Sequence, residues 1–160
     1  MENLWSPWRM KYITDNGIPG GECVFCASPK MADGPANLIV HRGENVYVIL
    51  NRFPYTTGHL MVVPFLHVPS IEDLAPATRA ELMEMVNNVL GVLRVVYHPD
   101  GFNVGINMGS AAGAGIAEHA HIHIVPRWGG DTNFMSTIGE TRVLPEELEE
   151  TFKRISTNWS

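Results

Sequence analysis

Three histidines alternate with apolar residues in the segment 119–128, which reads His-Ala-His-Ile-His-Ile-Val-Pro-Arg-Trp. Alternate side chains of a β-strand point to opposite faces, so His119, His121 and His123 would share one face. In a helix the same spacing would turn successive imidazoles by about 200° and scatter them. Two chemistries fit such a row: a metal site, because imidazole is a common zinc ligand, and a nucleophilic imidazole that forms a covalent intermediate. The row alone leaves both open.

The two cysteines of the chain form a C-x-x-C pair, Cys23 and Cys26. A redox pair is one interpretation, but Pro29 and the loop that follows do not fit the βαβ unit of a thioredoxin-like site. A coincidental pair of small hydrophobic residues is the second. The third is a tetrahedral zinc site, which needs two further ligands, usually histidine. The candidates are the histidines that sequence spacing cannot rank: His41, His59, His67, His98 and one end of the histidine row.

Length and charge narrow the classes of function. With 160 residues the chain is expected to form a single domain over residues 1–160, and its net charge of −6 argues against a nucleic-acid polymer as partner. A small anionic ligand still fits, because backbone amides and histidines bind phosphate without net positive charge. No apolar stretch approaches the ~20 residues that span a bilayer, and the amino terminus does not resemble a signal peptide. The expected location is cytoplasmic, with no membrane partner.

The elements that must position these residues are mostly strands. Residues 1–20, with Trp5 and Trp8, are interpreted as an extended arm whose aromatic side chains dock on the body or on a second subunit. Runs rich in β-forming residues predict strands over four segments besides the histidine row: 37–41, 46–50, 59–64 and 102–107. The segments 51–58 and 109–115 read as loops that lead into His59 and the histidine row. Five strands of this kind predict an α+β fold with an antiparallel sheet.

Two helices complete the expected fold. Apolar residues at helical spacing predict a long helix over Ile71–Tyr97, with Ser70 as its N-cap and Asp73 as the acid of a capping box. A short C-terminal helix opens at Pro145 and carries an apolar face. Its face consists of Leu144, Leu148, Phe152 and Ile155.

The histidine row resembles the signature of the histidine triad superfamily of nucleotidyl hydrolases and transferases. The resemblance covers nearly the whole chain, including the cysteine pair, Asn51 with His59 eight residues later, and Val63-Pro64 leading to His67. The segments 4–9 and 126–131 are similar to the microbial branch that contains diadenosine tetraphosphate phosphorylases. The resemblance implies a histidine triad fold, with a five-stranded antiparallel sheet.

The resemblance also implies roles for individual residues. Zinc-containing members hold a structural zinc with four residues, which here are Cys23, Cys26, His67 and His119. The middle histidine, His121, would be the nucleophile, and His59 and His123 would bind the phosphate that it attacks.

The remaining nucleotide-binding positions are also implied by the family. Asn51 matches the residue that binds the ribose hydroxyls, although asparagine also favours turns. Asn107 and the backbone of Gly113, Ala114 and Gly115 would cradle phosphate. The chain departs from many members at Gly115 and Ile116, where they carry Gln and then Ser or Thr that assist the leaving group. That assistance must come from elsewhere here.

The sequence therefore predicts a zinc-containing nucleotidyl hydrolase or transferase that acts through a nucleotidyl-histidine intermediate, with phosphorolysis of diadenosine tetraphosphate as the leading reaction. Hydrolysis of dinucleoside polyphosphates or adenylylated amines is the enzymatic alternative. A nucleotide-binding module with little turnover and a hydrolase with water on a three-histidine zinc are the other two. The family implies a homodimer, in some members a tetramer.

Overall fold

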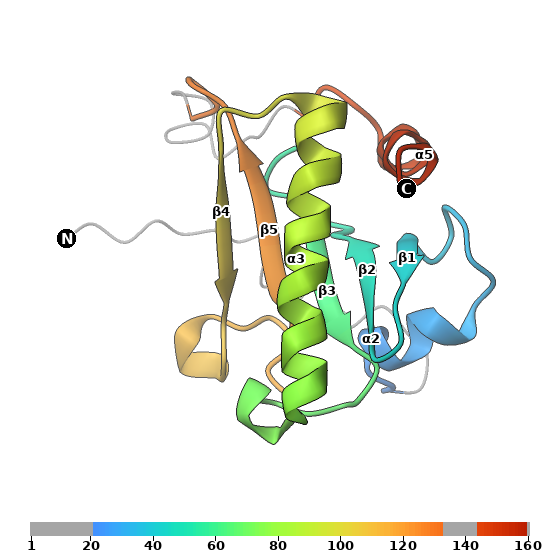
Figure 1. Cartoon of the computed structure of the whole chain (residues 1–160), viewed down its shortest axis with the longest axis vertical. Coiled ribbons are helices and arrows are strands. Elements are labelled where there is room, and N and C mark those ends of the chain that lie inside the picture. The colour runs from blue at the N-terminus through green and yellow to red at the C-terminus, as the bar shows by residue number, and fades with distance from the viewer. Residues whose placement is uncertain (1–20, 133–143, 160) are drawn as a thin grey trace.

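The computed structural model describes residues 21–132 and 144–159. Five antiparallel strands form one sheet in the order β1-β2-β3-β5-β4, and a long helix crosses one of its faces (Figure 1). The strands are β1 (Ile39–Arg42), β2 (Val46–Leu50), β3 (Leu60–Pro64), β4 (Gly101–Ile106) and β5 (Ile122–Arg127). The helices are α2 (Val24–Ala27), α3 (Pro76–Tyr97) and α5 (Leu148–Thr157), with 3₁₀ turns η1 (Ser28–Lys30), η2 (Ile71–Asp73) and η3 (Ser110–Ala112). The predicted α+β fold is confirmed, whereas the expected arm 1–20 lies outside the described residues.

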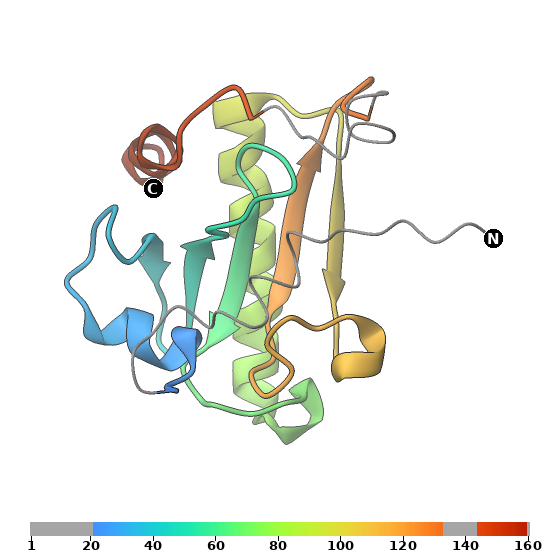
Figure 2. The ribbon, with the colours of Figure 1, turned by 180° about the vertical axis from the view of Figure 1, so that it is seen from behind.

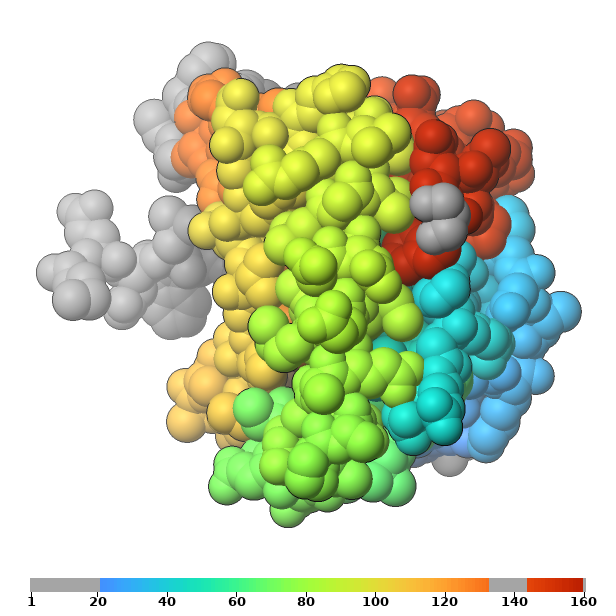
Figure 3. Space-filling view, viewed as in Figure 1, coloured from blue at the N-terminus to red at the C-terminus, as the bar shows by residue number. Residues whose placement is uncertain are grey.

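The core lies between α3 and the sheet. Every residue of β2 and β3 is buried. The buried side chains of α3 recur at helical spacing, as the sequence predicted, and Figure 3 shows α3 lying across the front of the molecule. Each large apolar side chain buried there contributes about 1.5–3 kcal/mol relative to an exposed one. Among the described helices, none is long and apolar enough to cross a membrane.

The long helix begins later than the sequence predicted. It starts at Pro76 with Ala75 as its N-cap, whereas residues 71–73 form the separate turn η2. Ser70 caps η2 instead, by accepting a hydrogen bond from the backbone of Glu72. Ala75 is extended (ψ 150°) because the proline ring that follows it disfavours the helical conformation. Pro76 therefore sets the first turn.

The histidine row is only partly a strand. β5 begins at Ile122, so His119 and His121 precede it, and His123 lies within it. The ladder between β3 and β5 ends at the pair Val62 and Ile122. Pro64 offers no N–H to continue the ladder, and the backbone N–H of Ala120 bonds to the carbonyl of Val68 instead. The prediction that all three histidines lie in one strand is therefore wrong for the first two.

The C-terminal helix also begins later than expected. α5 starts at Leu148 with Glu147 as its N-cap, so Pro145 and Leu144 lie before it. Glu146 holds this end of the helix, because it accepts hydrogen bonds from the hydroxyls of Tyr97 and Thr151. The prediction that Pro145 opens the helix is wrong. The hydrogen bonds of Glu146 to Tyr97 and Thr151 hold the chain before the first helical turn begins.

A backbone hydrogen bond ties together the two ends of the loop 51–58 between β2 and β3. The backbone N–H of Asn51 donates to the carbonyl of His59 at 2.9 Å. Gly58 adopts φ +78°, and a Cβ there would lie 3.2 Å from Leu93 and 3.3 Å from Tyr97. Glycine is needed at this position for both its conformation and its size.

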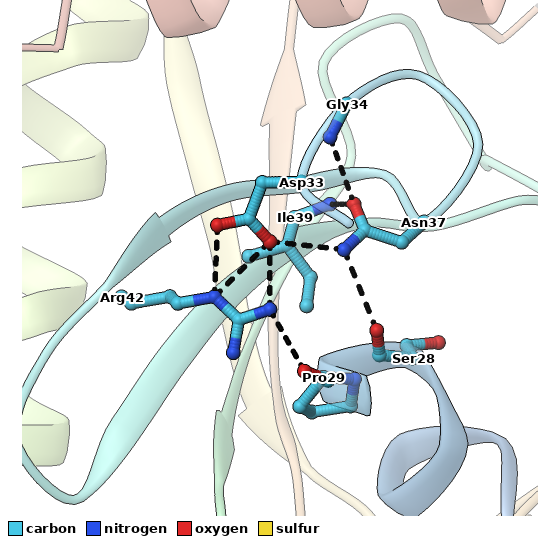
Figure 4. Close-up of polar contacts among 7 residues, drawn as sticks. All are labelled: Ser28, Pro29, Asp33, Gly34, Asn37, Ile39 and Arg42. Atoms are coloured by element: carbon cyan, nitrogen blue, oxygen red, sulfur yellow. Dashed lines mark hydrogen bonds and ion pairs between the residues drawn. The ribbon is translucent and has the colours of Figure 1, made fainter. Parts of the chain in front are cut away.

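A polar cluster fixes the loop between η1 and β1 (Figure 4). The Arg42 guanidinium donates to both oxygens of Asp33 and to the carbonyl of Pro29. The amide of Asn37 donates to Asp33 and accepts from the backbone of Ile39. These contacts hold the loop against the start of β1, at the edge of the sheet away from β4.

Candidate functional site

Four potential metal ligands lie together: Cys23, Cys26, His67 and His119, whose ligand atoms are all within 4.8 Å of one another. The Nδ1 atom of His119 lies 3.5 Å from Cys23 Sγ, 3.7 Å from Cys26 Sγ and 3.2 Å from His67 Nδ1. In a tetrahedral zinc site, bonds of about 2.3 Å to sulfur and 2.0 Å to nitrogen put S and N about 3.5 Å apart and two N atoms about 3.3 Å apart. The donor set thus fits a tetrahedral ion, and the structure brings together the four residues that the family resemblance implied.

Three segments far apart in the chain supply these ligands. Cys23 is the N-cap of α2 and Cys26 lies in its single turn, which the Tyr47 hydroxyl anchors by donating to the carbonyl of Phe25 at 2.8 Å. His67 follows β3, and His119 precedes β5. Burial raises the pKa of the Cys26 thiol, and the neighbouring Cys23 raises it further, so two adjacent thiolates need a cation beside them.

His119 is held with its Nδ1 atom facing the cluster. Its Nε2 atom lies 2.8 Å from the carbonyl oxygen of Pro64. Because a carbonyl oxygen only accepts, Nε2 carries the proton and Nδ1 has the lone pair. Burial lowers the pKa of His119, which favours this neutral form. The backbone at the end of β3 thus selects the tautomer that a metal ligand requires.

The neutral form of His121 carries its proton on the other ring nitrogen. Its Nδ1 atom lies 2.8 Å from the carbonyl oxygen of His119, so Nδ1 carries the proton and Nε2 the lone pair. Burial lowers the pKa of His121, although the bond to His119 opposes this, and the imidazole is therefore favoured in its neutral form. A neutral ring whose Nε2 atom keeps its lone pair is the form in which imidazole attacks an electrophile.

His59 and His123 form a directed pair. The backbone N–H of Tyr55 donates to Nδ1 of His59 at 3.2 Å, and Nε2 of His59 lies 3.0 Å from Nδ1 of His123. Because Nδ1 of His59 accepts, its proton lies on Nε2, which then donates to His123. In a neutral His123 the remaining proton is on Nε2. The rings of His121 and His123 are 4.7 Å apart, so the two imidazoles are neighbours.

Asn51 is engaged with the protein. Its Oδ1 accepts from the backbone of Phe53 at 2.9 Å, and its Nδ2 lies 3.4 Å from Nδ1 of His59. The first contact makes Asn51 a turn residue, and the second makes it a positioning residue for His59.

The expected phosphate-binding positions separate in the structure. Asn107 lines a cavity together with His123. Gly113, Ala114 and Gly115 do not line it. Two of their amides are used within the loop, because Gly113 donates to Ser110 and Ala114 to Gly109. The structure therefore brings Asn107 to the histidines, and the glycine loop mainly closes on itself.

The three histidines of the row do not converge on one point. His119 faces the cysteines, His121 donates to its own backbone segment, and His123 pairs with His59. A zinc ion held by all three, as in the metal-dependent hydrolase alternative, has no support in this arrangement.

Two residues that the sequence did not single out contribute to the site. The ring of Phe25 lies 4.8 Å from that of His121 and 5.4 Å from that of His119. Tyr55 places its ring 4.7 Å from His59 and 6.3 Å from His123. The position of Phe25 inside the C-x-x-C pair was the available signal. Trp128, the last residue of the segment 119–128, donates from Nε1 to the carbonyl of Tyr97 at 3.4 Å and is half-buried.

Comparison with known proteins decides the family. Residues 34–130 match the model of the HIT domain family. The chain belongs to the HIT family. Over its full length this HIT protein is 41% identical to a Mycobacterium tuberculosis protein named AP-4-A phosphorylase, of which it covers 85%. It is 32% identical, over 70% of its length, to the asymmetrical bis(5'-nucleosyl)-tetraphosphatase of Schizosaccharomyces pombe, of which it covers 58%.

Solved structures agree with this assignment. A zinc-bound histidine triad family protein from Mycobacterium smegmatis superposes with a TM-score of 0.69 at 29% identity. The match covers 86% of this HIT protein and 93% of that one. The predicted family and fold are thereby confirmed.

Proposed function

We propose that this HIT protein is a nucleotidyl transferase that cleaves diadenosine tetraphosphate by phosphorolysis through His121. The observation that carries the proposal is the bond from Nδ1 of His121 to the carbonyl of His119, which leaves Nε2 as the nucleophilic atom. Neutral imidazole is a competent nucleophile at physiological pH. The choice of substrate and of phosphate as acceptor is supported by the full-length similarity to the protein named AP-4-A phosphorylase.

The reaction has two balanced steps. Nε2 of His121 attacks the α-phosphorus of one adenosine, the N–P bond forms, and the bridging P–O bond breaks so that ATP departs with the electron pair. An oxygen of inorganic phosphate then attacks the same phosphorus, the N–P bond breaks, and ADP leaves with His121 restored. The donor Nε2–H of His123, oriented by His59, stabilises charge on the phosphoryl oxygens in both steps.

Other residues complete the proposed site. Asn107 binds phosphate beside His123, and Asn51 keeps His59 in place while the ribose hydroxyls remain its second proposed contact. Of the proposed phosphate cradle formed by Gly113, Ala114 and Gly115, the amide of Gly115 is the proposed contact, because the amides of Gly113 and Ala114 donate within the loop.

A zinc ion is the proposed occupant of the cysteine–histidine cluster. Cys23, Cys26, His67 and His119 form a closed Cys₂His₂ set, which leaves no position for water or substrate. Support comes from the ligand spacing and from the zinc-bound histidine triad protein of Mycobacterium smegmatis. The role of this zinc would be structural: it joins α2 to the segment before β5.

The proposal extends to the whole molecule. We infer that residues 1–160 form one domain, that the protein acts in the cytoplasm, and that it is a homodimer or a tetramer. Strand β4 lies at an edge of the sheet, and Val104 on it is 45% exposed. Such an edge can pair with a second copy. Sedimentation velocity of the purified chain tests the dimer.

The decisive experiment incubates the protein with labelled diadenosine tetraphosphate, with and without inorganic phosphate. Phosphorolysis gives ADP and ATP in equal amounts only when phosphate is present, whereas hydrolysis gives AMP and ATP without it. His121→Ala should lose turnover by at least about three orders of magnitude, as nucleophile removal does. Mass analysis of the wild type, quenched and digested in alkali where the P–N bond of a nucleotidyl-histidine survives, should find adenylate on His121. Turnover by His121→Ala close to the wild-type rate would refute the covalent mechanism.

Hydrolysis remains the second candidate because the Schizosaccharomyces pombe relative is named a tetraphosphatase. The two reactions share the first step and differ in the acceptor. A nucleotide-binding module would bind diadenosine tetraphosphate without forming either product set.

A further inference from the structure

A cavity of about 440 Å³ opens beside His123. His123 and Asn107 line one end, and Arg127, Asp131 and Thr132 line the other. It lies along β4 and β5, and Figure 2 shows the sheet from behind, the side away from α3. The proposed mechanism uses only the end beside His123.

The pairing of β4 with β5 determines which residues line the cavity. His123 and Arg127 lie on one face of β5 because they are an even number of residues apart, about 13 Å along a strand. On the neighbouring strand Gly105 is opposite His123, and Asn103 is opposite Val125. A Cβ at Gly105 would meet nothing within 4 Å. The cavity therefore extends well beyond the space of one phosphate.

Arg127 is held at the far end in a fixed orientation. Its Nε and Nη2 atoms donate to the two oxygens of Asp131 at 2.5 and 2.6 Å, and Nη1 donates to Asn103 Oδ1 at 2.7 Å. Asp131 also accepts from the backbone N–H of Trp128. The Arg127 side chain is nevertheless 41% exposed. A preoriented, accessible guanidinium is well suited to phosphate oxygens, and its five donors exceed those its protein partners require.

The charged side chains of the cavity lie at the end beside Arg127. Among the described residues that line the cavity, none is a Lys and Arg127 is the one Arg, while Asp131, which pairs with it, is the one acidic residue. The whole chain carries a net charge of −6, so a polyphosphate needs a local cation to bind. The side chains that assist the leaving group in many family members are missing at Gly115 and Ile116. A second binding point for the departing group thus has a place in this chain.

We propose that the cavity receives the departing half of the dinucleotide, with Arg127 against the distal phosphates of the chain that leads to the second nucleoside. This inference rests on the proposed function, because it concerns the group that leaves when His121 attacks. Arg127 contacts phosphates remote from the reacting bond. It therefore strengthens binding of the dinucleotide equally in the ground and transition states, and its loss raises KM more than it lowers kcat.

The test compares two substrates with the same adenylyl half. Diadenosine tetraphosphate has a long departing group, and adenosine 5'-phosphoramidate has only ammonia. The measured quantity is the ratio of kcat/KM for the dinucleotide to kcat/KM for the phosphoramidate. Arg127→Gln should lower this ratio about tenfold, the effect of one lost charge-assisted contact, through KM of the dinucleotide. Gly105→Val should lower it as well, because the new side chain enters open cavity without displacing a neighbour.

Two matched variants control for altered stability. Arg42→Gln breaks a comparable Arg–Asp pair at the opposite edge of the sheet (Figure 4). Gly91→Val adds the same side chain to the exposed surface of α3, where nothing lies within 4 Å and outside the cavity lining. Both should keep the ratio within about twofold of wild type, which is small beside the tenfold loss expected at Arg127.

The outcomes separate this inference from the proposed function. A ratio that stays at the wild-type value in both Arg127→Gln and Gly105→Val overturns the inference while nucleotidyl transfer stands. The same conclusion follows if the wild type cleaves the phosphoramidate but not the dinucleotide. If the wild type cleaves neither, the proposed function fails and the inference fails with it.

Discussion

The ring of Phe25 packs 4.8 Å from the ring of His121, so a residue between Cys23 and Cys26 of the proposed zinc site also packs against the proposed nucleophile. Phe25 is 3% exposed, and its carbonyl accepts from Tyr47. The cysteine–histidine cluster and the proposed nucleophile are therefore joined by the packing of Phe25 as well as by the two-residue step from His119 to His121.

Phe25→Ala should reduce kcat about tenfold with little change in KM, because the freed His121 ring meets the attack geometry less often. It should also cost about 3–5 kcal/mol of stability, as large-to-small core substitutions do. Phe25→Leu should restore most of kcat. Phe152→Ala, a half-buried site on α5, serves as the control: it should lower the melting temperature and leave kcat alone. Steady-state kinetics beside thermal melts would show whether kcat follows the ring or only the stability.

Cys23→Ser should abolish metal binding. The purified wild type should contain about one zinc per chain by elemental analysis, and the variant close to none, because a closed four-ligand site needs every ligand. The variant should also melt at a lower temperature. Chelation that removes activity while melting is unaffected would contradict a structural role. A wild type without zinc, purified without chelators, would contradict the metal assignment.

Asn51→Ala should weaken the orientation of His59. The lost turn contact to Phe53 costs about 1 kcal/mol, the usual value for a hydrogen bond. The lost contact to His59 should lower kcat several-fold. Asn51→Asp retains the acceptor for Phe53, so it separates the two effects. If KM alone rises in Asn51→Ala, a ribose contact explains the residue better than positioning does.

Asp131 makes stability depend on pH in acid. Hydrogen bonds from Arg127 hold the pKa of this carboxyl well below its ordinary value, and the backbone of Trp128 and the hydroxyl of Thr132 lower it further. A carboxyl whose pKa is lowered by folding stabilises the protein fully above its unfolded pKa of about 3.9. That contribution is lost as the pH falls toward the folded pKa. The difference in free energy of unfolding between wild type and Asp131→Asn should therefore be constant above about pH 5 and shrink below pH 4. Denaturant melts across this range measure it, and a difference that grows in acid would contradict the assignment.

The sequence was most informative where pattern and composition act locally. The apolar spacing of α3 and the alternating strands predicted the α+β sheet, because burial of one face determines both periods. Errors lie at proline. Pro76 delays α3, and Pro64 stops the ladder before His119 and His121. Pro76 acts on the backbone conformation of Ala75, and Pro64 acts by lacking an N–H for the sheet. The apolar pattern encodes neither effect.

The candidate site was likewise predicted only in part. The family resemblance named the four clustered ligands and the pair His59 and His123, which the structure brings together. The tautomers did not follow from the sequence, because they depend on backbone carbonyls at Pro64 and His119 that face the rings only after folding. Arg127 escaped notice as a binding residue for a similar reason: its partners Asp131 and Asn103 lie on different segments of the chain.

The length of the loop closed by Asn51 and His59 determines where the amide of Tyr55 lies. The ends of the loop are tied by a backbone bond, and Gly58 packs too tightly against α3 to admit a side chain. Arg52 and Phe53 between these ends are exposed, and the Arg52 guanidinium donates to the carbonyl of Ala36. Gain or loss of a residue would slide the amide of Tyr55 away from the imidazole it orients, so a change in the length of this loop should disturb His59 more than a change in one of its exposed side chains.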